Sequence, residues 1–130
     1  MESLMKEEQQ QIIEHYITSY NAFDVEGMLK NLDSEVIFEN TTNGKVDLRT
    51  KGIQEFKEQA EASKHYFTQR KQRILSWRFK ESHVSIEIDY QAVLAIDLPN
   101  GMKAGDLLEL KGVSEFEFDL GKIKKITDNS

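Results

Sequence analysis

The chain has 130 residues, of which 38% are apolar and 31% are charged, as in an ordinary soluble globular protein. Its length is that of one domain, so we expect a single domain over residues 1–130. A formal net charge of −6 argues against a nucleic acid or an anionic membrane as a partner, because both require a basic face. The absence of cysteine excludes disulfides, thiolate nucleophiles and cysteine metal sites.

The sequence has no apolar run near the roughly 18 residues that are needed to span a bilayer. The first residues, MESLMKEEQQQ, are charged and rich in glutamine, unlike a secretory signal peptide. We therefore expect a cytoplasmic protein.

The first half of the chain predicts three helices. Over residues 6–22, apolar side chains recur three and four positions apart, as on one face of a helix. Asp24 suits the N-cap of a short second helix whose apolar stripe reaches Leu32. Gly52 begins a third helix, which continues to about Tyr66.

Alternating apolar residues predict strands between and after these helices. Residues 35–40 form a strand, and residues 46–49 suit a short return strand. From Phe67 onward the predicted strands include Leu75, Trp77 and Phe79 on one face, then residues 84–96, 108–118 and 122–128. Long strands with one apolar face need helices packed on that face. We therefore expect an α+β fold, with three helices on a curved, mostly antiparallel sheet.

The opposite face of the two longest strands is only partly polar. Val93 and Ala95 on one strand, and Leu107 and Val113 on the next, interrupt a row of polar side chains. A partly apolar outer face predicts a homodimer through that face. Scattered surface hydrophobes are the alternative explanation.

The order of these elements resembles the nuclear transport factor 2-like superfamily, and most of all its SnoaL-like group. The resemblance rests on a first helix that runs into Asn21-Ala22-Phe23-Asp24, the strand Glu35-Val36-Ile37-Phe38-Glu39, the helix that begins at Gly52, and a closing hairpin Phe116-Glu117-Phe118…Gly121-Lys122-Ile123. Because it covers nearly the whole chain, it implies a single SnoaL-like domain with a cone-shaped, cystatin-like fold around a hydrophobic pocket. The superfamily includes ketosteroid isomerases, polyketide cyclases, limonene epoxide hydrolases, dehydratases and non-catalytic modules, so the fold does not define the function.

The catalytic residues of ketosteroid isomerases match this chain only in part. The resemblance places their helix-one tyrosine at Tyr16, their carboxylate base at Asn40 and their oxyanion-hole acid at Ser114. Because an amide does not accept the proton, steroid isomerisation by that mechanism is not expected.

Two other groups of the superfamily direct attention to the last predicted strand. In limonene epoxide hydrolases the water-holding asparagine and aspartate match Asn40 and Asp128, whereas their tyrosine position is Phe38. Their arginine–aspartate pair has no convincing match on the concave face. SnoaL-type polyketide cyclases also place an acid/base aspartate near the last strand, and Asp128 again matches.

Polar residues on the apolar faces of the predicted elements define the candidate site, because a polar group there needs a partner or a ligand. We assign Asp128 as the base, since an apolar cavity raises the pKa of a carboxyl group toward working pH. Tyr16, Asn40 and Ser114 are the groups expected to orient the substrate. Four further residues are expected to contact a ligand: Tyr20, Phe38, Tyr90 and Phe116.

Each polar assignment has a structural alternative. Tyr16 and Tyr20 suit core aromatics whose hydroxyl reaches the rim. Asn40 suits a turn residue that bonds its own backbone, and Ser114 suits a close helix contact. Asp128 lies near the end of the sequence, where it suits an exposed acid on a frayed strand.

The remaining charged residues give weaker signals. The three histidines are isolated, so we expect no metal site, and no motif indicates a cofactor. Lys64, Arg70, Lys71 and Arg73 form a basic cluster, which we interpret as a solvated strand face, with an anionic ligand at the mouth of the cone as the alternative.

The sequence therefore predicts a protein that holds a small apolar or cyclic molecule in its cone. It favours acid/base chemistry of an isomerase, cyclase, dehydratase or hydrolase. The alternative is a non-catalytic ligand-binding or protein-interaction and dimerisation module of the same fold. The choice between an enzyme and such a module stays open at this point.

Overall fold

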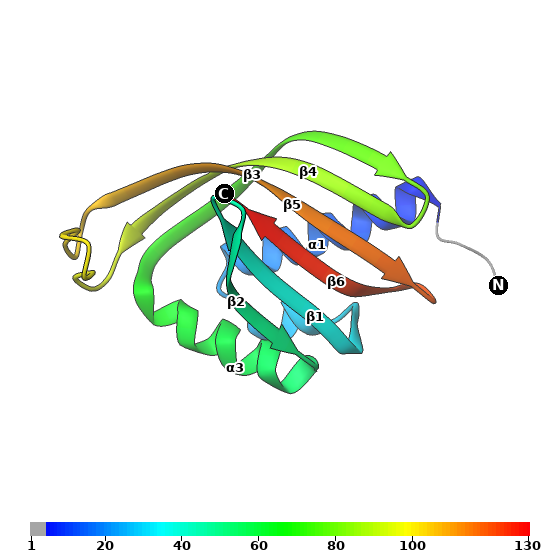
Figure 1. Cartoon of the computed structure of the whole chain (residues 1–130), viewed down its shortest axis with the longest axis horizontal. Coiled ribbons are helices and arrows are strands. Elements are labelled where there is room, and N and C mark those ends of the chain that lie inside the picture. The colour runs from blue at the N-terminus through cyan, green and yellow to red at the C-terminus, as the bar shows by residue number, and fades with distance from the viewer. Residues whose placement is uncertain (1–4) are drawn as a thin grey trace.

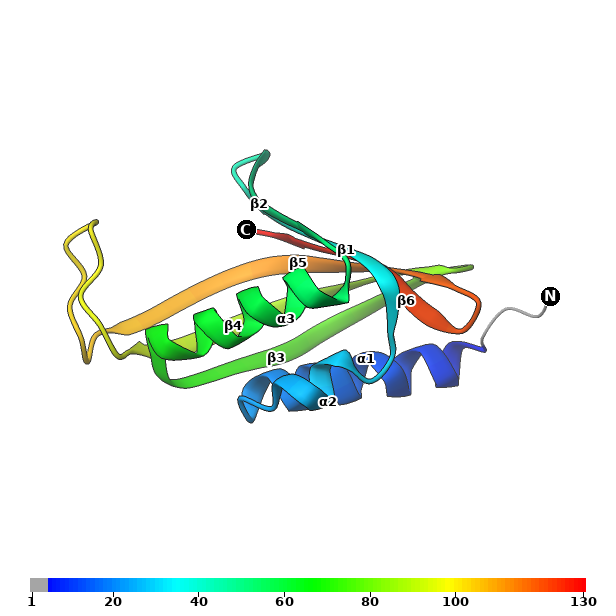
Figure 2. The ribbon, with the colours of Figure 1, turned by 90° about the horizontal axis from the view of Figure 1, so that it is seen from below.

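The computed structural model describes residues 5–130, in which three α-helices pack on the concave face of a six-stranded sheet (Figures 1 and 2). The helices are α1 (Lys6–Asn21), α2 (Val25–Leu29) and α3 (Ile53–Ser63), and the 3-10 turn η1 (Lys64–Tyr66) follows α3. The third predicted helix therefore ends earlier as an α-helix than expected, because its last turn tightens to 3-10 geometry.

The sheet is mostly antiparallel, as predicted. Its strands are β1 (Leu32–Thr42), β2 (Lys45–Lys51), β3 (Phe67–Lys80), β4 (His83–Leu94), β5 (Leu107–Asp119) and β6 (Lys122–Asn129). They lie in the order β2-β1-β6-β5-β4-β3, and only β1 and β6 are paired in parallel. The parallel pair brings the first and last strands together at the centre of the sheet.

An apolar core fills the space between α1, α3 and the concave face. Ile13 of α1, Phe56 of α3 and Phe116 of β5 are among its members, and Ile13 and Phe116 are fully buried. The apolar stripes of α1 and α3 are therefore surfaces that these helices bury. The stripe predicted for the second helix extends too far, because α2 ends at Leu29 and the buried Leu32 begins β1. Within the part of the chain that the structure describes, no helix has both the length and the apolar character that crossing a membrane requires.

The expectation that Leu75 shares a face with Trp77 and Phe79 is wrong. A bulge between Ile74 and Ser76 adds one residue to β3 and breaks the alternation of faces. Ile74, Trp77 and Phe79 pack against the core, whereas Leu75 is 47% exposed. The fourth strand is also shorter than predicted, since β4 ends at Leu94 before a long loop.

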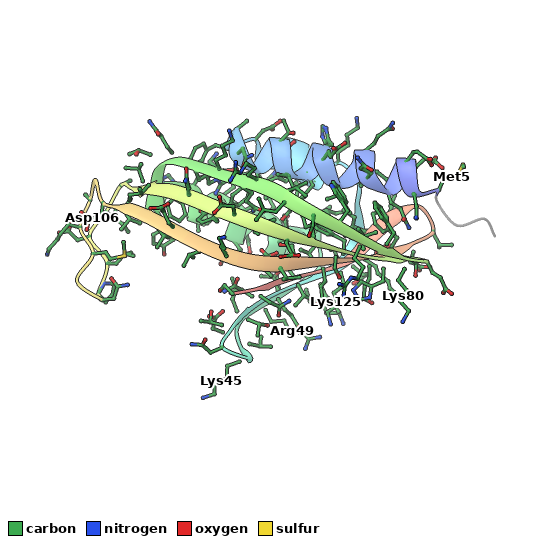
Figure 3. The ribbon with its side chains drawn as sticks, turned by 90° about the horizontal axis from the view of Figure 1, so that it is seen from above. Met5, Lys45, Arg49, Lys80, Asp106 and Lys125 are labelled. Carbon is green, nitrogen blue, oxygen red and sulfur yellow. The ribbon has the colours of Figure 1, made fainter. Side chains whose placement is uncertain are left out.

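The convex face of the sheet carries ion pairs beside isolated apolar side chains. Glu39 forms ion pairs with Arg49 at 3.3 Å (Nε to Oε2) and with Lys125 at 3.7 Å (Nζ to Oε1). Figure 3 shows Arg49 and Lys125 on the side of the sheet away from α1. Leu107 and Val113 are exposed there, and the homodimer through this face stays a prediction.

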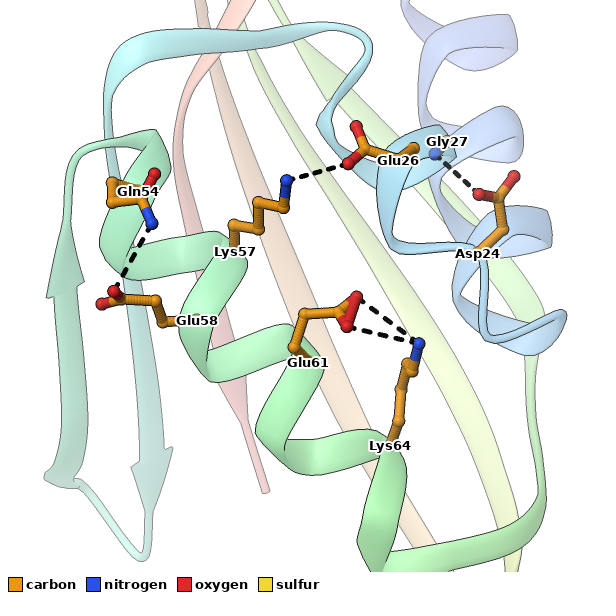
Figure 4. Close-up of polar contacts among 8 residues, drawn as sticks. All are labelled: Asp24, Glu26, Gly27, Gln54, Lys57, Glu58, Glu61 and Lys64. Atoms are coloured by element: carbon orange, nitrogen blue, oxygen red, sulfur yellow. Dashed lines mark hydrogen bonds and ion pairs between the residues drawn. The ribbon is translucent and has the colours of Figure 1, made fainter.

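Helix α2 begins where the sequence predicts. The Asp24 carboxylate caps it by accepting a hydrogen bond at 3.0 Å from the backbone N–H of Gly27 (Figure 4). This bond satisfies one of the N–H groups that have no partner inside the helix.

Replacing Asp24 with alanine should lower the free energy of unfolding by about 1 kcal/mol, because the capping acceptor is lost. Urea denaturation of the two proteins measures the change. Glu26→Ala is the matched control in the same helix: it removes only an exposed ion pair with Lys57, 3.0 Å away (Figure 4), and should change stability little. Equal effects of the two substitutions would contradict the capping role.

Candidate functional site

A cavity with two compartments lies against the concave face of the sheet. The large compartment, about 330 Å³, is lined from α1, β1, β2 and α3, with Tyr16, Phe38 and Phe56 among its walls. The small compartment, about 140 Å³, lies over β3 to β6, with Gln72 and Tyr90 among its walls. Tyr20, Asn40 and Asp128 line both, so the compartments meet at these three residues.

Asp128 sits where the two compartments meet, and it is fixed in β6 by its neighbours on both sides. It lies opposite Ser114 of β5 and Asn40 of β1. The Ser114 hydroxyl, itself 1% exposed, donates a hydrogen bond of 2.7 Å to Asp128 Oδ1. The side chain therefore does not belong to a frayed end.

The burial of Asp128 changes its acidity. Desolvation raises the pKa of the Asp128 carboxyl to about 6, although the hydrogen bond from Ser114 acts in the opposite direction. The carboxyl group consequently exchanges its proton close to neutral pH, as a general acid or base requires.

Tyr16 projects from α1 into the large compartment. Its ring packs edge-on against that of Phe116, with the centroids 5.8 Å apart. Burial raises the pKa of Tyr16 well above its ordinary value, and the charge of Asp128 adds to this effect. Tyr16 is therefore a neutral hydroxyl that can donate a hydrogen bond into the cavity.

Tyr20 and Tyr90 join α1 to β4 across the small compartment. Their hydroxyl oxygens are 3.0 Å apart, which is hydrogen-bonding distance. Burial raises the pKa of both residues, so both hydroxyls stay protonated at neutral pH. One of the two protons serves the bond between them, and the other has no acceptor among the hydrogen bonds of residues 5–130, so it can be donated to a ligand.

Asn40 lines both compartments, but its amide nitrogen is engaged in the β1–β2 hairpin. Nδ2 donates to Asp47 Oδ1 at 2.9 Å, while the Thr42 hydroxyl donates to Oδ2 at 2.7 Å. These two bonds lower the pKa of Asp47. Asn40 therefore bonds within its hairpin, as the structural alternative expected, but its partner is the Asp47 side chain of β2 and not its own backbone.

The two phenylalanines expected to contact a ligand differ in position. Phe38 lines the large compartment, with its ring 5.8 Å from that of Phe56. Phe116 is fully buried and is absent from both linings, because it lies on the inner face of a central strand with Tyr16 packed over it. Its position supports Tyr16 and does not offer a surface to a ligand.

No family model and no curated protein matches the sequence. Solved structures match it over nearly its whole length. A candidate polyketide cyclase from Xanthomonas campestris pv. campestris is 19% identical with a TM-score of 0.81, over 96% of this chain and 91% of that one.

A candidate SnoaL-like polyketide cyclase from Jannaschia sp. CCS1 is 8% identical, also with a TM-score of 0.81, over 98% of this chain and 88% of that one. An NTF2-like protein of unknown function from Burkholderia pseudomallei K96243 is 13% identical with a TM-score of 0.71, over 93% and 88%. The chain has the nuclear transport factor 2-like fold. The fold predicted from the sequence resemblance is thereby confirmed, and identities this low establish nothing beyond the fold.

Two residues of the chain were missed as site residues. Arg70, placed in a solvated basic cluster, is only 5% exposed and points inward from β3. Gln72, 7% exposed, lines the small compartment. The alternation of β3 was an available signal, because both positions keep step with the inward Ile74.

The other members of that basic cluster lie outside the core. Lys71 and Arg73 are exposed on β3, and Arg73 Nη2 pairs with Asp89 Oδ2 at 2.9 Å. Within residues 5–130, no group of three or more histidine, aspartate or glutamate side chains is placed to hold a metal ion.

Proposed function

We propose that the protein binds a small, largely apolar or cyclic molecule in this cavity and moves a proton on it through Asp128. The observation that carries the proposal is the half-buried Asp128 carboxyl, which Ser114 holds at 2.7 Å at the junction of the two compartments. Isomerases, cyclases, dehydratases and hydrolases all need such a step. That two solved proteins of the same fold are candidate polyketide cyclases favours a cyclic, oxygenated compound.

The proposed mechanism assigns one task to each polar group. The Asp128 carboxylate removes a proton from the bound molecule, and its pKa of about 6 suits transfer in either direction near neutral pH. Ser114 fixes the orientation of the carboxylate. The neutral hydroxyl of Tyr16, in the same compartment, donates to an oxygen on which negative charge develops.

A non-catalytic binding module is the second candidate function. It is favoured by Asn40, whose amide nitrogen donates to Asp47 and is therefore engaged away from a bound molecule. Under this alternative the cavity binds the same kind of molecule without changing it.

A carboxyl titration by NMR tests the acid/base assignment. We expect the Asp128 signal to titrate at about pH 6, and we expect it to titrate higher in Ser114→Ala, because the hydrogen bond that lowers the pKa is removed. A small apolar probe such as naphthalene, added to the wild-type protein, should shift signals of residues that line the large compartment.

The outcomes separate the two candidate functions. A titration near the ordinary aspartate value of about 3.9, with the probe bound, leaves only the binding module. A normal titration without probe binding contradicts both functions.

A further inference from the structure

Arg70 is a buried cation that makes no ion pair within residues 5–130. Its Nε donates a 2.8 Å hydrogen bond to the backbone carbonyl of Tyr20, but Nη1 and Nη2 are closed off from solvent and have no partner in the described part of the chain. A buried charge is costly unless it is paired. Its retention on the inner face of the sheet therefore needs an explanation.

Two aromatic rings hold the guanidinium in place. Its central carbon lies 3.7 Å from the ring centroid of Tyr20 and 4.4 Å from that of Phe23. Phe23 adopts a left-handed backbone conformation, with φ at 59°, which is unfavourable for a large side chain. The turn after α1 is thus strained at Phe23, the residue whose ring forms one wall of the Arg70 site.

The Tyr20 ring connects the Arg70 site to the small compartment. The guanidinium lies on the face of the Tyr20 ring, and the Tyr90 hydroxyl oxygen lies 3.0 Å from the Tyr20 hydroxyl oxygen. The positive charge of Arg70 opposes the rise in pKa that burial causes at Tyr16, Tyr20 and Tyr90. The charge therefore acts on all three hydroxyl groups of the cavity.

Gln72 adds an unpaired polar group to the same compartment. Its backbone is fixed by Asn21, which donates to the Gln72 carbonyl at 3.0 Å and accepts from its N–H at 2.8 Å. Gln72 is only 7% exposed, and its Oε1 has no hydrogen-bond partner among the residues that the structure describes. Rotation about the last side-chain bond turns either end of the amide toward a ligand.

We infer that the small compartment is an anion subsite, which receives a negatively charged oxygen of a ligand whose apolar frame fills the large compartment. The free hydroxyl proton of the Tyr20–Tyr90 pair and the amide of Gln72 would donate to this oxygen. Arg70 acts through its field as a positioning residue and does not touch the ligand. The inference rests on the proposed function and narrows its ligand to a compound that carries an anionic oxygen.

The test compares a charged ligand with a neutral one of the same shape. 2-Naphthoate and 2-naphthamide share one bicyclic frame, and NMR titration gives the dissociation constant of each. We expect Arg70→Met to weaken the binding of 2-naphthoate about tenfold relative to 2-naphthamide. Arg73→Met is the matched control on the same strand: it removes an exposed arginine paired with Asp89 and should leave the ratio unchanged.

A second variant keeps the test decisive if Arg70→Met does not fold. Tyr90→Phe removes one hydroxyl and keeps the ring, so it should lower the preference for 2-naphthoate several-fold. The inference is overturned if the ratio of the two affinities stays the same in the variants that fold. A loss of stability alone would not move this ratio, because both ligands bind the same folded protein.

Two further readouts distinguish a failure of the anion subsite from a failure of the proposed function. If Arg70→Met weakens 2-naphthoate relative to 2-naphthamide, the subsite binds the carboxylate of the ligand; if it only slows proton exchange of a bound ketone, the anion subsite is rejected. If the wild-type protein binds 2-naphthamide and Arg70→Met leaves the ratio of the two affinities unchanged, the anion subsite is rejected and the proposed function stands. Wild-type protein that binds neither compound contradicts the proposed function itself, and the inference with it.

Discussion

Asp128→Asn should slow protein-catalysed proton exchange on a bound ketone by about 10²–10⁴-fold, the usual contribution of a positioned general base. Asparagine keeps the size of the side chain and still accepts a hydrogen bond from the Ser114 hydroxyl, but it does not take up a proton near neutral pH. The substitution therefore removes the chemistry while it preserves the shape of the cavity.

2-Tetralone in D₂O is a suitable reporter for this prediction. The Asp128 carboxylate would take a proton from the carbon between the ring and the carbonyl, leaving an enolate whose charge lies on oxygen. The acid then exchanges its proton with the solvent and returns a deuteron to the same carbon. Proton NMR follows the loss of that signal, and the rate in buffer alone is subtracted.

The matched control makes the same chemical change on the other side of the sheet. Asp89 lies on the outer face of β4, where it pairs with Arg73 at 2.9 Å, so Asp89→Asn should exchange at the wild-type rate. If Asp128→Asn binds 2-tetralone and exchanges it as fast as the wild type, the base assignment is wrong. If the wild type binds the ketone without accelerating exchange, the cavity is a binding module for such compounds.

The element order was predictable because it depends on local periodicity. The stripe of α1 and the Asp24 cap are read from residues close together in the sequence, and the structure has both. The contact between β1 and β6, which brings Asn40 next to Asp128, joins strands from opposite ends of the chain. Only the resemblance to the nuclear transport factor 2-like superfamily indicated this contact, since alternation within a strand does not show which strand lies beside it.

The errors arise where one residue changes the geometry around it. Leu75 turns outward because of a bulge that the alternation of apolar residues does not reveal. Arg70 was grouped with exposed cations by composition, whereas its burial depends on the left-handed turn at Phe23 that supplies one of its two aromatic walls. Asn40 bonds to Asp47 beside a shift in the register of β1 and β2 between Asn40 and Thr41.

The same property that suits Asp128 for catalysis should make the folded protein less stable as the pH rises. The carboxyl has a pKa of about 6 in the folded chain, against about 3.9 in an unfolded one. The folded state therefore binds the proton more tightly. The stability that this proton contributes is fully present below about pH 3.9 and is lost as the pH rises through about 6.

The size of this effect follows from the two pKa values. A difference of about two units corresponds to about 3 kcal/mol at most, and less if solvent reaches the half-buried carboxyl. Asparagine has no such titration, so the stability of Asp128→Asn relative to the wild type should rise by up to about 3 kcal/mol between about pH 4 and about pH 8. Urea denaturation of both proteins across this range measures the difference, in which the other titrating groups cancel.

The pH dependence of that difference is the informative quantity, because a constant offset would reflect only the packing of the amide. A difference that stays flat would mean that Asp128 titrates alike in the folded and unfolded chains, and it would remove the basis for a general base in this cavity. A difference that rises through about pH 6, while Asp128→Asn loses proton exchange, would show that the group which costs stability is the group which moves the proton. Active sites commonly make this exchange of stability for reactivity, and here one half-buried carboxyl would account for both the lost stability and the gained reactivity.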